Sequence, residues 1–290
     1  MFTSYLKTIE SIVGPYTEEE VYSIYADPNT GKTVLLLGEV FNAISQGQRV
    51  VWIDTEGGHE GMFKQFGPSY AKRFGVDINK LEDKYEYIQL LTAQELINYF
   101  GVDAEILYDK KISVLMKGFK TKPDGTIYEN WGKKKGNLVI IIDSFSSPFR
   151  LGFSTKVENF SARADAQGVL VYGLLRFMRQ TSAIVIMTHH SSRNPVDVYT
   201  QVGKVRGGNT VTYYSKYMLD IEKPKSRALE DYRQIFGVRT ARGKSWDLRG
   251  WAKINSEGYV DSAQTEVDDI IMKKRKKAIE HLDDGSAGDL

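Results

Sequence analysis

The sequence contains no cysteine among its 290 residues. This absence excludes disulfide bonds, zinc sites built on cysteine ligands, and catalysis by a thiol. The chain also lacks a strong charge of either sign, because 39 lysines and arginines balance 37 aspartates and glutamates. With no overall basic field, any contact with nucleic acid has to come from a local group of residues.

Long apolar stretches are missing as well. No run in the sequence approaches the roughly 20 apolar residues that a membrane-spanning helix needs. The start of the chain carries Lys7 and Glu10 and has no extended apolar centre, so it does not resemble a secretory signal peptide. The length suits one large α/β domain with an ample core. We therefore expect a soluble, intracellular protein that is cytoplasmic, nucleoid-associated and without membrane contact.

The most informative segment runs from Ala26 to Thr33. It follows an apolar, β-rich run at 21–25 and precedes an apolar run at 34–44 with helical periodicity. A strand, a short loop and a helix form the setting of a phosphate-binding loop, because the helix N-terminus offers unpaired N–H groups to an anion. Ala26 replaces the first glycine of the GxxxxGK[ST] pattern, so the match is to a looser form of that motif.

Three residues of this loop have distinct predicted roles. Gly31 lets the backbone come close to a phosphate, which a Cβ atom would obstruct. Lys32 can reach the β- and γ-phosphates of ATP, and the Thr33 hydroxyl can ligate Mg²⁺. The predicted nucleotide-binding residues are Ala26, Asp27, Pro28, Asn29, Thr30, Gly31, Lys32 and Thr33.

Apolar patterning predicts an α/β fold, because strands that alternate with helices form a mostly parallel sheet. Residues 218–260 are typical of strands joined by turns, including an antiparallel edge. The other predicted strands are buried ones at 49–54 and 183–188, a central one at 138–142 and a short one at 85–90. Helices are predicted at 92–108 and 161–181.

The expected organisation has three parts: a short lead at 1–20, a core at 21–262, and a terminal helix with a frayed tail at 263–290. A lysine-rich stretch at about 108–136 is predicted to be an inserted hairpin or long loop. The basic run 273–277 lies near the end of the terminal helix, where positive charge complements the helix dipole. We interpret this run as a solvated helix end, with a nucleic-acid patch as the alternative.

Two carboxylates follow predicted strands, where ligands bind in open parallel sheets. Asp143 comes directly after the strand at 138–142, the position from which a carboxylate orients the Mg²⁺ water shell beside Thr33. Glu56 follows the strand at 49–54 and can orient and deprotonate an attacking water molecule. The alternative is that Asp143 caps a turn and that Glu56 lies in an ordinary polar turn.

Several segments resemble, in the same order, those of RecA/RadA-type recombinase ATPases. Residues 52–57 (WIDTEG) are similar to the segment that carries that family's catalytic glutamate. Residues 138–144 (LVIIIDS) and 148–150 (PFR) resemble its Walker B strand and the start of its first DNA-binding loop. The remaining similar segments are 185–190 (VIMTHH), 207–214 (GGNTVTYY), 218–222 (MLDIE) and 238–244 (VRTARGK).

The resemblance covers about 20–260 and implies a RecA-like P-loop ATPase core, with a mostly parallel central sheet flanked by helices. It implies that Lys32 and Thr33 bind phosphate and Mg²⁺, that Glu56 is the general base, and that Asp143 is the Walker B acid. The cofactors implied are ATP and Mg²⁺.

Three further positions carry implied catalytic roles. His190 stands where the family has a glutamine that senses the γ-phosphate, and unlike glutamine a histidine can take up a proton near physiological pH. Arg242 and Lys244 would act on ATP bound by an adjacent subunit, as an arginine finger does. The alternatives are a strand-end histidine without a role and a solvated basic turn.

DNA contact is implied for two loops, at about 146–167 and 191–208. Basic residues interleaved with aromatic ones suit single-stranded DNA, because phosphate attraction and base stacking tolerate any sequence. The candidate DNA-binding residues are Arg150, Lys156, Arg163, Arg193, Lys204 and Arg206, with Phe153, Phe160 and Tyr199 as candidate stacking groups.

Taken together, the motifs predict an ATP-dependent DNA-binding protein of homologous recombination or DNA repair that hydrolyses ATP at subunit interfaces. Only about 20 residues precede the first strand, so we expect a RadA/RadB-like paralogue without the family's small N-terminal DNA-binding domain. The expected partners are single- or double-stranded DNA and either further copies of the chain, in a filament or ring, or a recombinase. The alternatives are an ATP-binding assembly paralogue with little turnover, and a helicase-like or KaiC-like ATPase.

Overall fold

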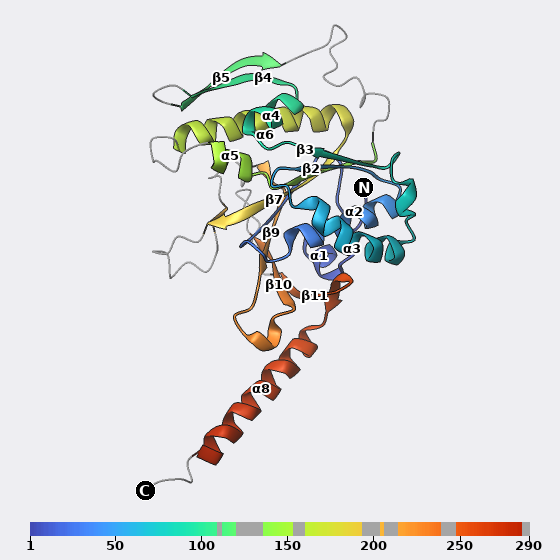
Figure 1. Cartoon of the computed structure of the whole chain (residues 1–290), viewed down its shortest axis with the longest axis vertical. Coiled ribbons are helices and arrows are strands. Elements are labelled where there is room, and N and C mark those ends of the chain that lie inside the picture. Colours follow the sequence, from blue (N-terminus) through green and yellow to red (C-terminus); the bar gives the residue numbers. More distant parts are fainter. Residues whose placement is uncertain are drawn as a thin grey trace.

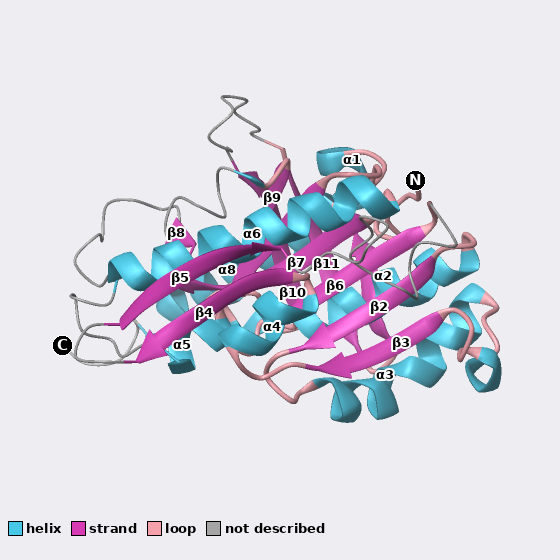
Figure 2. Ribbon diagram, turned by 90° about the horizontal axis from the view of Figure 1, so that it is seen from above, coloured by secondary structure: helices cyan, strands magenta, loops and turns pink. Residues whose placement is uncertain are grey.

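The computed structural model describes residues 1–108, 112–119, 136–152, 160–192, 204–205, 214–238 and 248–285. Its centre is a ten-stranded sheet with the order β12-β11-β10-β9-β1-β7-β6-β2-β3, in which β8 pairs with β7 (Figure 1). Helices cover both faces of this sheet (Figure 2). The predicted α/β fold, with a mostly parallel sheet and an antiparallel edge, is confirmed.

Six strands pair in parallel, and most are nearly continuous apolar runs, as expected for strands covered on both faces. Three strands form the antiparallel edge, and a short one pairs antiparallel with β7. The parallel strands are β1 (Val21–Ala26), β2 (Arg49–Asp54), β3 (Tyr85–Gln89), β6 (Leu138–Asp143), β7 (Ile184–Ser192) and β9 (Tyr217–Glu222). The others are β8 (Lys204–Val205), β10 (Tyr232–Val238), β11 (Arg249–Asn255) and β12 (Gly258–Ser262).

Alternate side chains of the central strands β1, β2, β6 and β7 enter different cores, because successive residues point to opposite faces of the sheet. In β2, for example, Trp52 belongs to the cluster that includes the first three helices, and Ile53 to the opposite cluster. The first cluster includes residues of α1 (Lys7–Val13), α2 (Lys32–Ser45) and α3 (His59–Phe74). The second includes residues of α4 (Ala93–Tyr99), α5 (Ser147–Gly152) and α6 (Phe160–Thr181). Among the described residues, two short 3₁₀ turns, η1 (Ile78–Lys80) and η3 (Arg227–Leu229), lie between elements.

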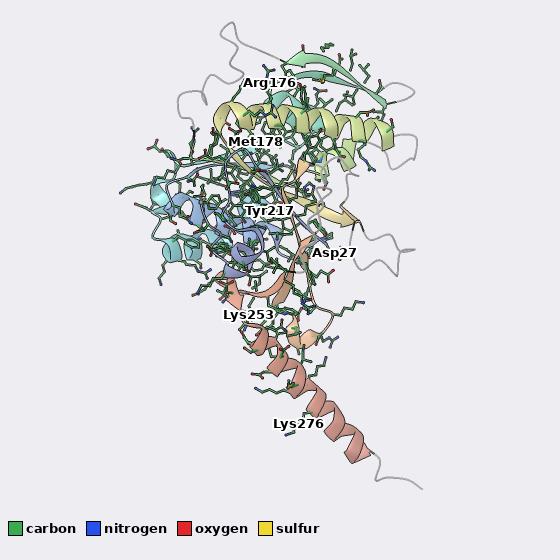
Figure 3. All side chains as sticks on the ribbon, turned by 180° about the vertical axis from the view of Figure 1, so that it is seen from behind. Asp27, Arg176, Met178, Tyr217, Lys253 and Lys276 are labelled. Atoms are coloured by element: carbon green, nitrogen blue, oxygen red, sulfur yellow. The ribbon has the colours of Figure 1, made fainter. Side chains whose placement is uncertain are left out.

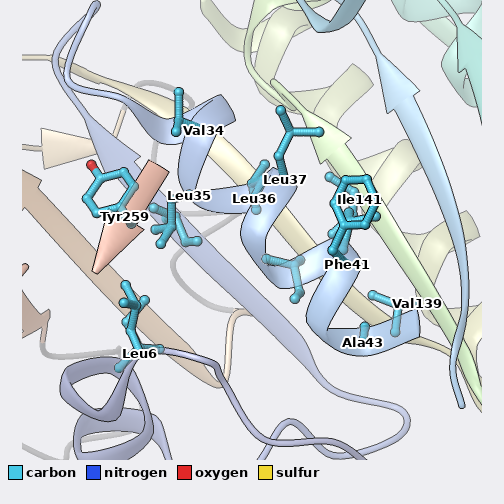
Figure 4. Packing of buried hydrophobic residues seen from close by; sticks show 14 of the residues in the cluster. Leu6, Val34, Leu35, Leu36, Leu37, Phe41, Ala43, Val139, Ile141 and Tyr259 are labelled. Carbon is cyan, nitrogen blue, oxygen red and sulfur yellow. The ribbon is translucent and has the colours of Figure 1, made fainter. Parts of the chain in front are cut away.

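Helix α2, which follows the phosphate-binding loop, is buried around almost its whole circumference. Figure 4 shows Leu35, Leu36 and Phe41 of this helix packed near Ile141 of β6 and Tyr259 of β12. A helix that is apolar all round belongs in the interior of a domain. The loop that precedes α2 is therefore fixed to the middle of the molecule.

The strand register aligns the ends of the central strands. Ala26 at the end of β1 pairs with His190 in β7, and Asp54 at the end of β2 pairs with Asp143 at the end of β6. These are residues of the segments that the sequence predicted to be functional. Parallel pairing thus places their carboxyl-end loops at one edge of the sheet.

The prediction of a helix at 92–108 is wrong for the second half of this range. A capping box of Thr92 and Glu95 starts α4, which ends at Tyr99, and Gly101 then has a φ of 69°. Residues 102–108 form β4 (Val102–Tyr108), which pairs antiparallel with β5 (Ile112–Phe119). Val102, Ala104 and Ile106 are buried, and this period of two is that of a strand.

The two ends of the chain pack differently. The first residues join the main core, since Phe2, Leu6 and Ile9 are buried in it. At the other end, α8 (Gln264–Gly285) packs its first turns on Tyr232 and Trp251 through Val267 and then extends away from the sheet (Figures 1 and 3). Among the described residues, no helix is long and apolar enough to span a bilayer.

A buried glutamate joins the first segment to the core. Glu39 of α2 is fully buried and accepts hydrogen bonds from the hydroxyls of Ser4 and Tyr16. Burial raises the pKa of Glu39 to about 8, against the opposing effect of these hydrogen bonds. The folded protein therefore holds a proton on this side chain that the unfolded chain loses near pH 4.5.

We expect the free energy of unfolding to fall as the pH rises from about 4.5 towards 8, because in that window the folded state binds one proton more than the unfolded state. One such group contributes a slope of at most about 1.4 kcal/mol per pH unit. Urea unfolding at several pH values measures this slope, and Glu39→Gln should flatten it. The exposed Glu82, changed to Gln, is the control and should leave the slope unchanged. Equal slopes for Glu39→Gln and the unmodified chain would contradict the assignment.

Candidate nucleotide-binding site

The loop from Ala26 to Thr33 has the form that its sequence predicts. β1 ends at Ala26 and α2 begins at Lys32, with Gly31 as the N-cap at a φ of 104°. A Cβ atom on Gly31 would lie 2.5 Å from Cδ1 of Ile254 and 3.0 Å from the hydroxyl of Tyr259. The backbone conformation and the lack of space both restrict this position to glycine.

Lys32 is buried, and its charge is directed into the loop. Its Nζ atom donates hydrogen bonds to the carbonyl oxygens of Ala26, at 3.1 Å, and Asp27, at 3.2 Å. Burial lowers the pKa of Lys32, while Asp143 and Glu56 act in the opposite direction. A buried ammonium group on the first residue of a helix, whose N-terminal amides are open, suits a phosphate ligand.

Thr33 and Asp143, the two residues of the predicted Mg²⁺ site, are in direct contact. The Thr33 hydroxyl donates to Oδ2 of Asp143 at 2.7 Å, and the Thr188 hydroxyl of β7 donates to Oδ1 at 2.5 Å. Burial raises the pKa of Asp143, and the two hydrogen bonds oppose that shift. Oxygen donors of this kind fit Mg²⁺, which keeps several waters and binds through few protein ligands. No group of three or more acidic or histidine side chains that could hold a metal occurs in the part of the chain described.

The loop that carries Glu56 is organised by a residue that the sequence analysis did not single out. Oδ1 of Asp54 accepts hydrogen bonds from the backbone N–H groups of Glu56, at 2.9 Å, and Gly57, at 2.8 Å. Its Oδ2 accepts from the His59 N–H at 3.2 Å and the Tyr87 hydroxyl at 3.0 Å. An aspartate side chain that accepts a hydrogen bond from the backbone N–H two residues later forms an Asx turn. The sequence Asp-Thr-Glu-Gly is a signal from which this turn could have been predicted.

A second set of hydrogen bonds joins the ends of β2 and β6. The Thr55 hydroxyl donates to the Ser144 carbonyl at 2.6 Å and accepts from the Ser144 N–H at 2.8 Å. The peptide bond between Asp143 and Ser144 is cis. The two hydrogen bonds between Thr55 and Ser144 fix Glu56, the residue after Thr55, beside the end of β6.

Glu56 and His190 meet across the site. Nε2 of His190 lies 2.5 Å from Oε1 of Glu56, and the Ser144 hydroxyl donates to the same oxygen at 2.6 Å. Burial alone would raise the pKa of Glu56, but the hydrogen bonds from His190 and Ser144, with the charges of His190 and Lys32, lower it to about 2. Glu56 is therefore ionised at neutral pH and held by two donors.

The neighbouring histidine points away from Glu56. His189 is fully buried, with Nε2 at 3.1 Å from the Ser23 hydroxyl, which in turn lies 2.7 Å from the Ser215 hydroxyl. Burial lowers the pKa of His189 to about 3, so this ring is neutral. Of the two adjacent histidines, His190 is the one that reaches the site.

The structure gives less information on the other predicted residues. Arg163 lies on helix α6, half-buried, and not on a loop as expected, because α5 and α6 occupy most of 146–167. The backbones of Arg150 and Lys204 lie in α5 and β8. The candidate residues outside the described part of the chain are Lys156, Arg193, Arg206, Arg242 and Lys244, together with the candidate stacking groups Phe153 and Tyr199.

Comparison with known proteins supplies relatives but no family model, since none matches the chain. "DNA repair and recombination protein RadB" of Methanococcus maripaludis strain C7 is 23% identical over 219 residues, which cover 75% of this chain and 83% of that protein. RadB of Methanococcoides burtonii is 23% identical over 240 residues, covering 83% and 85%. "Protein RecA" of Streptomyces venezuelae is 30% identical over 100 residues, covering 32% of this chain and 25% of that protein.

We expect His190→Leu to raise the pKa of the Glu56 carboxyl group, because it removes a hydrogen bond and a nearby charge. Ser144→Ala should raise that pKa by less, since it removes one hydrogen bond and no charge. NMR titration of ¹³C-labelled glutamate side chains measures both shifts. A Glu56 pKa that stays near 2 in His190→Leu would contradict the geometry of this pair.

Proposed function

Because the chain is a recombinase-like protein of the RecA/RadA family, we propose that it is a Mg²⁺-dependent ATPase that binds DNA and acts in homologous recombination or DNA repair. The observation that carries the proposal is the contact between the ends of three central strands and the phosphate-binding loop. Thr33 is hydrogen-bonded to Asp143, and Glu56 is hydrogen-bonded to His190, at the same edge of the sheet. The RadB and RecA relatives support the same proposal.

In the proposed reaction, the N–H groups at the start of α2 and the Lys32 ammonium bind the phosphates of ATP. Thr33 and Asp143 would hold Mg²⁺, which when bound offsets the charge of the β- and γ-phosphates. Glu56 orients the attacking water molecule and accepts its proton. These roles correspond to positions at the carboxyl ends of parallel strands, where such ligands bind.

The Glu56–His190 hydrogen bond describes the state of the site before ATP binds. With two donors on one oxygen, Glu56 is a weak base. A γ-phosphate that accepts a hydrogen bond from His190 would release Glu56, and the basicity of the carboxylate would then rise. His190 would thus report the γ-phosphate to the catalytic glutamate, and its strand, β7, leads into the second candidate DNA loop at 191–208.

Further parts of the proposal rest on the sequence. Arg242 and Lys244 would act on ATP held by an adjacent subunit, in a filament or ring. Single-stranded DNA would contact the two loops through the basic residues Arg150, Lys156, Arg163, Arg193, Lys204 and Arg206.

One observation favours a second candidate, an ATP-binding assembly paralogue with little turnover. Both donors on Glu56 lower its basicity, and a weak base favours slow hydrolysis. Such a protein would bind ATP to fix a subunit interface or to dock on a recombinase. ATP-dependent association without hydrolysis would distinguish it.

Glu56→Gln tests the catalytic role. We expect ATP turnover to fall by at least about 100-fold, the usual contribution of a general base, while ATP binding changes little. Phosphate release and nucleotide titration measure the two quantities. Glu60→Gln is the matched control, since Glu60 is exposed in the first turn of α3 and pairs with Lys64. Undiminished turnover in Glu56→Gln would remove Glu56 from the catalytic role.

Lys204→Ala combined with Arg206→Ala tests the second DNA loop. We expect weaker binding of single-stranded DNA and a smaller salt dependence, by about 0.7 in the log–log slope for each lost phosphate contact. Fluorescence anisotropy over a range of salt concentrations measures both. Lys80→Ala removes an exposed lysine of η1 and should change neither. Identical affinity and slope in the double variant would exclude this loop from the DNA contact.

A further inference from the structure

A buried arginine lies beneath the phosphate-binding loop and was not part of any predicted motif. Arg233 of β10 is 6% exposed. Its Nε atom donates to the Thr30 carbonyl at 2.7 Å, and its Nη1 atom donates to the carbonyls of Glu230, at 2.6 Å, and Tyr232, at 2.7 Å. The guanidinium group therefore connects the antiparallel edge of the sheet to the loop.

The charge of Arg233 is unbalanced within the described residues. It forms no ion pair with a described carboxylate, and its bonds to Thr30, Glu230 and Tyr232 all go to neutral carbonyl oxygens. A buried cation without a counter-charge is costly. Arg233 lies next to the phosphate-binding loop, so its positive charge can attract the phosphates of a bound nucleotide.

A second donor acts on the same atom. The Tyr259 hydroxyl of β12 donates to the Thr30 carbonyl at 3.2 Å, and the Tyr259 ring, together with Ile254, closes the space beside Gly31. Two side chains from the antiparallel edge, Arg233 and Tyr259, thus donate hydrogen bonds to the same carbonyl of the loop.

The direction of that peptide group determines what the loop can bind. In a trans peptide the C=O and N–H groups point in opposite directions. When the Thr30 carbonyl points to Arg233 and Tyr259, the Gly31 N–H points away from them. This N–H belongs to the group of unpaired amides at the start of α2, which form the anion site.

We propose that Arg233, with Tyr259, is a positioning residue for the nucleotide: it fixes the 30–31 peptide with its N–H towards the phosphates and supplies a buried positive charge behind them. The inference rests on the proposed function of the nucleotide site. It extends that site to residues of the antiparallel edge, in β10 and β12. Arg233 touches the loop and not the nucleotide, so its effect appears in nucleotide affinity.

The test compares three variants of the full chain by titration with Mg·ATP, and measures their melting temperatures without nucleotide. Arg233→Met should weaken ATP binding by about 10- to 100-fold, the range expected for a lost hydrogen bond to a charged group. Arg233→Lys keeps the charge and should recover part of that loss. Tyr259→Phe removes one neutral hydrogen bond to Thr30 and should weaken binding only a few-fold.

Arg73→Met is the matched control. Arg73 also donates to backbone carbonyls of the β11–β12 hairpin, those of Tyr259 at 2.6 Å and Glu257 at 3.4 Å, but it makes no hydrogen bond to the phosphate-binding loop. We expect it to lower the melting temperature without changing the affinity for ATP. This separates a structural effect of the hairpin from the positioning of the loop.

Folded Arg233→Lys and Tyr259→Phe proteins that bind ATP as tightly as the unmodified chain would overturn the inference, whether or not Arg233→Met folds. In that case ATP binding by the unmodified chain would leave the proposed function standing. If the unmodified chain itself does not bind Mg·ATP, the proposed function fails and the inference fails with it.

Discussion

The register of the parallel strands is the constraint on which the rest of the site depends. Pairing of Ala26 with His190 and of Asp54 with Asp143 brings the ends of β1, β2 and β6 and residue His190 of β7 to one edge of the sheet. A slip of one residue would turn every side chain of a strand to the opposite face. The contacts of Thr33 with Asp143 and of Glu56 with His190 would then be lost together. Since both faces of these strands are buried in separate cores, such a slip would move the side chains of each core into the other and disrupt the packing of both.

Around that register, three supports hold the site. Helix α2 is enclosed by the core, so the end of the loop cannot move freely. Asp54 and the Thr55–Ser144 hydrogen bonds hold the opposite side of the site. Arg233 and Tyr259 hold the Thr30 carbonyl from the antiparallel edge. The same edge carries α8, because the Tyr232 hydroxyl, next to Arg233 in sequence, donates to Glu266 at 2.5 Å.

The sequence was sufficient to predict the central strands and the residues that follow them, because apolar runs, loop glycines and strand-end carboxylates are local signals. It was insufficient where a contact joins distant segments: Arg233 and Thr30 are 203 positions apart, and nothing near Arg233 marks its partner. The prediction of one helix at 92–108 fails because the apolar period changes to two at Val102, where β4 begins. Helix α3 was not predicted, and it contains Pro68 together with internal glycines, which obscure a helical pattern. The roles of Arg242, Lys244 and the DNA loops stay predictions, since most of those residues lie outside the described part of the chain.

The most direct test of the account is phosphate release from Mg·ATP by the unmodified chain, with and without single-stranded DNA, over a range of protein concentrations. The proposed site predicts hydrolysis that DNA stimulates, and an activity per subunit that rises with concentration because Arg242 and Lys244 act across a subunit interface. Tight binding of Mg·ATP with no hydrolysis at any concentration, with or without DNA, would contradict the account.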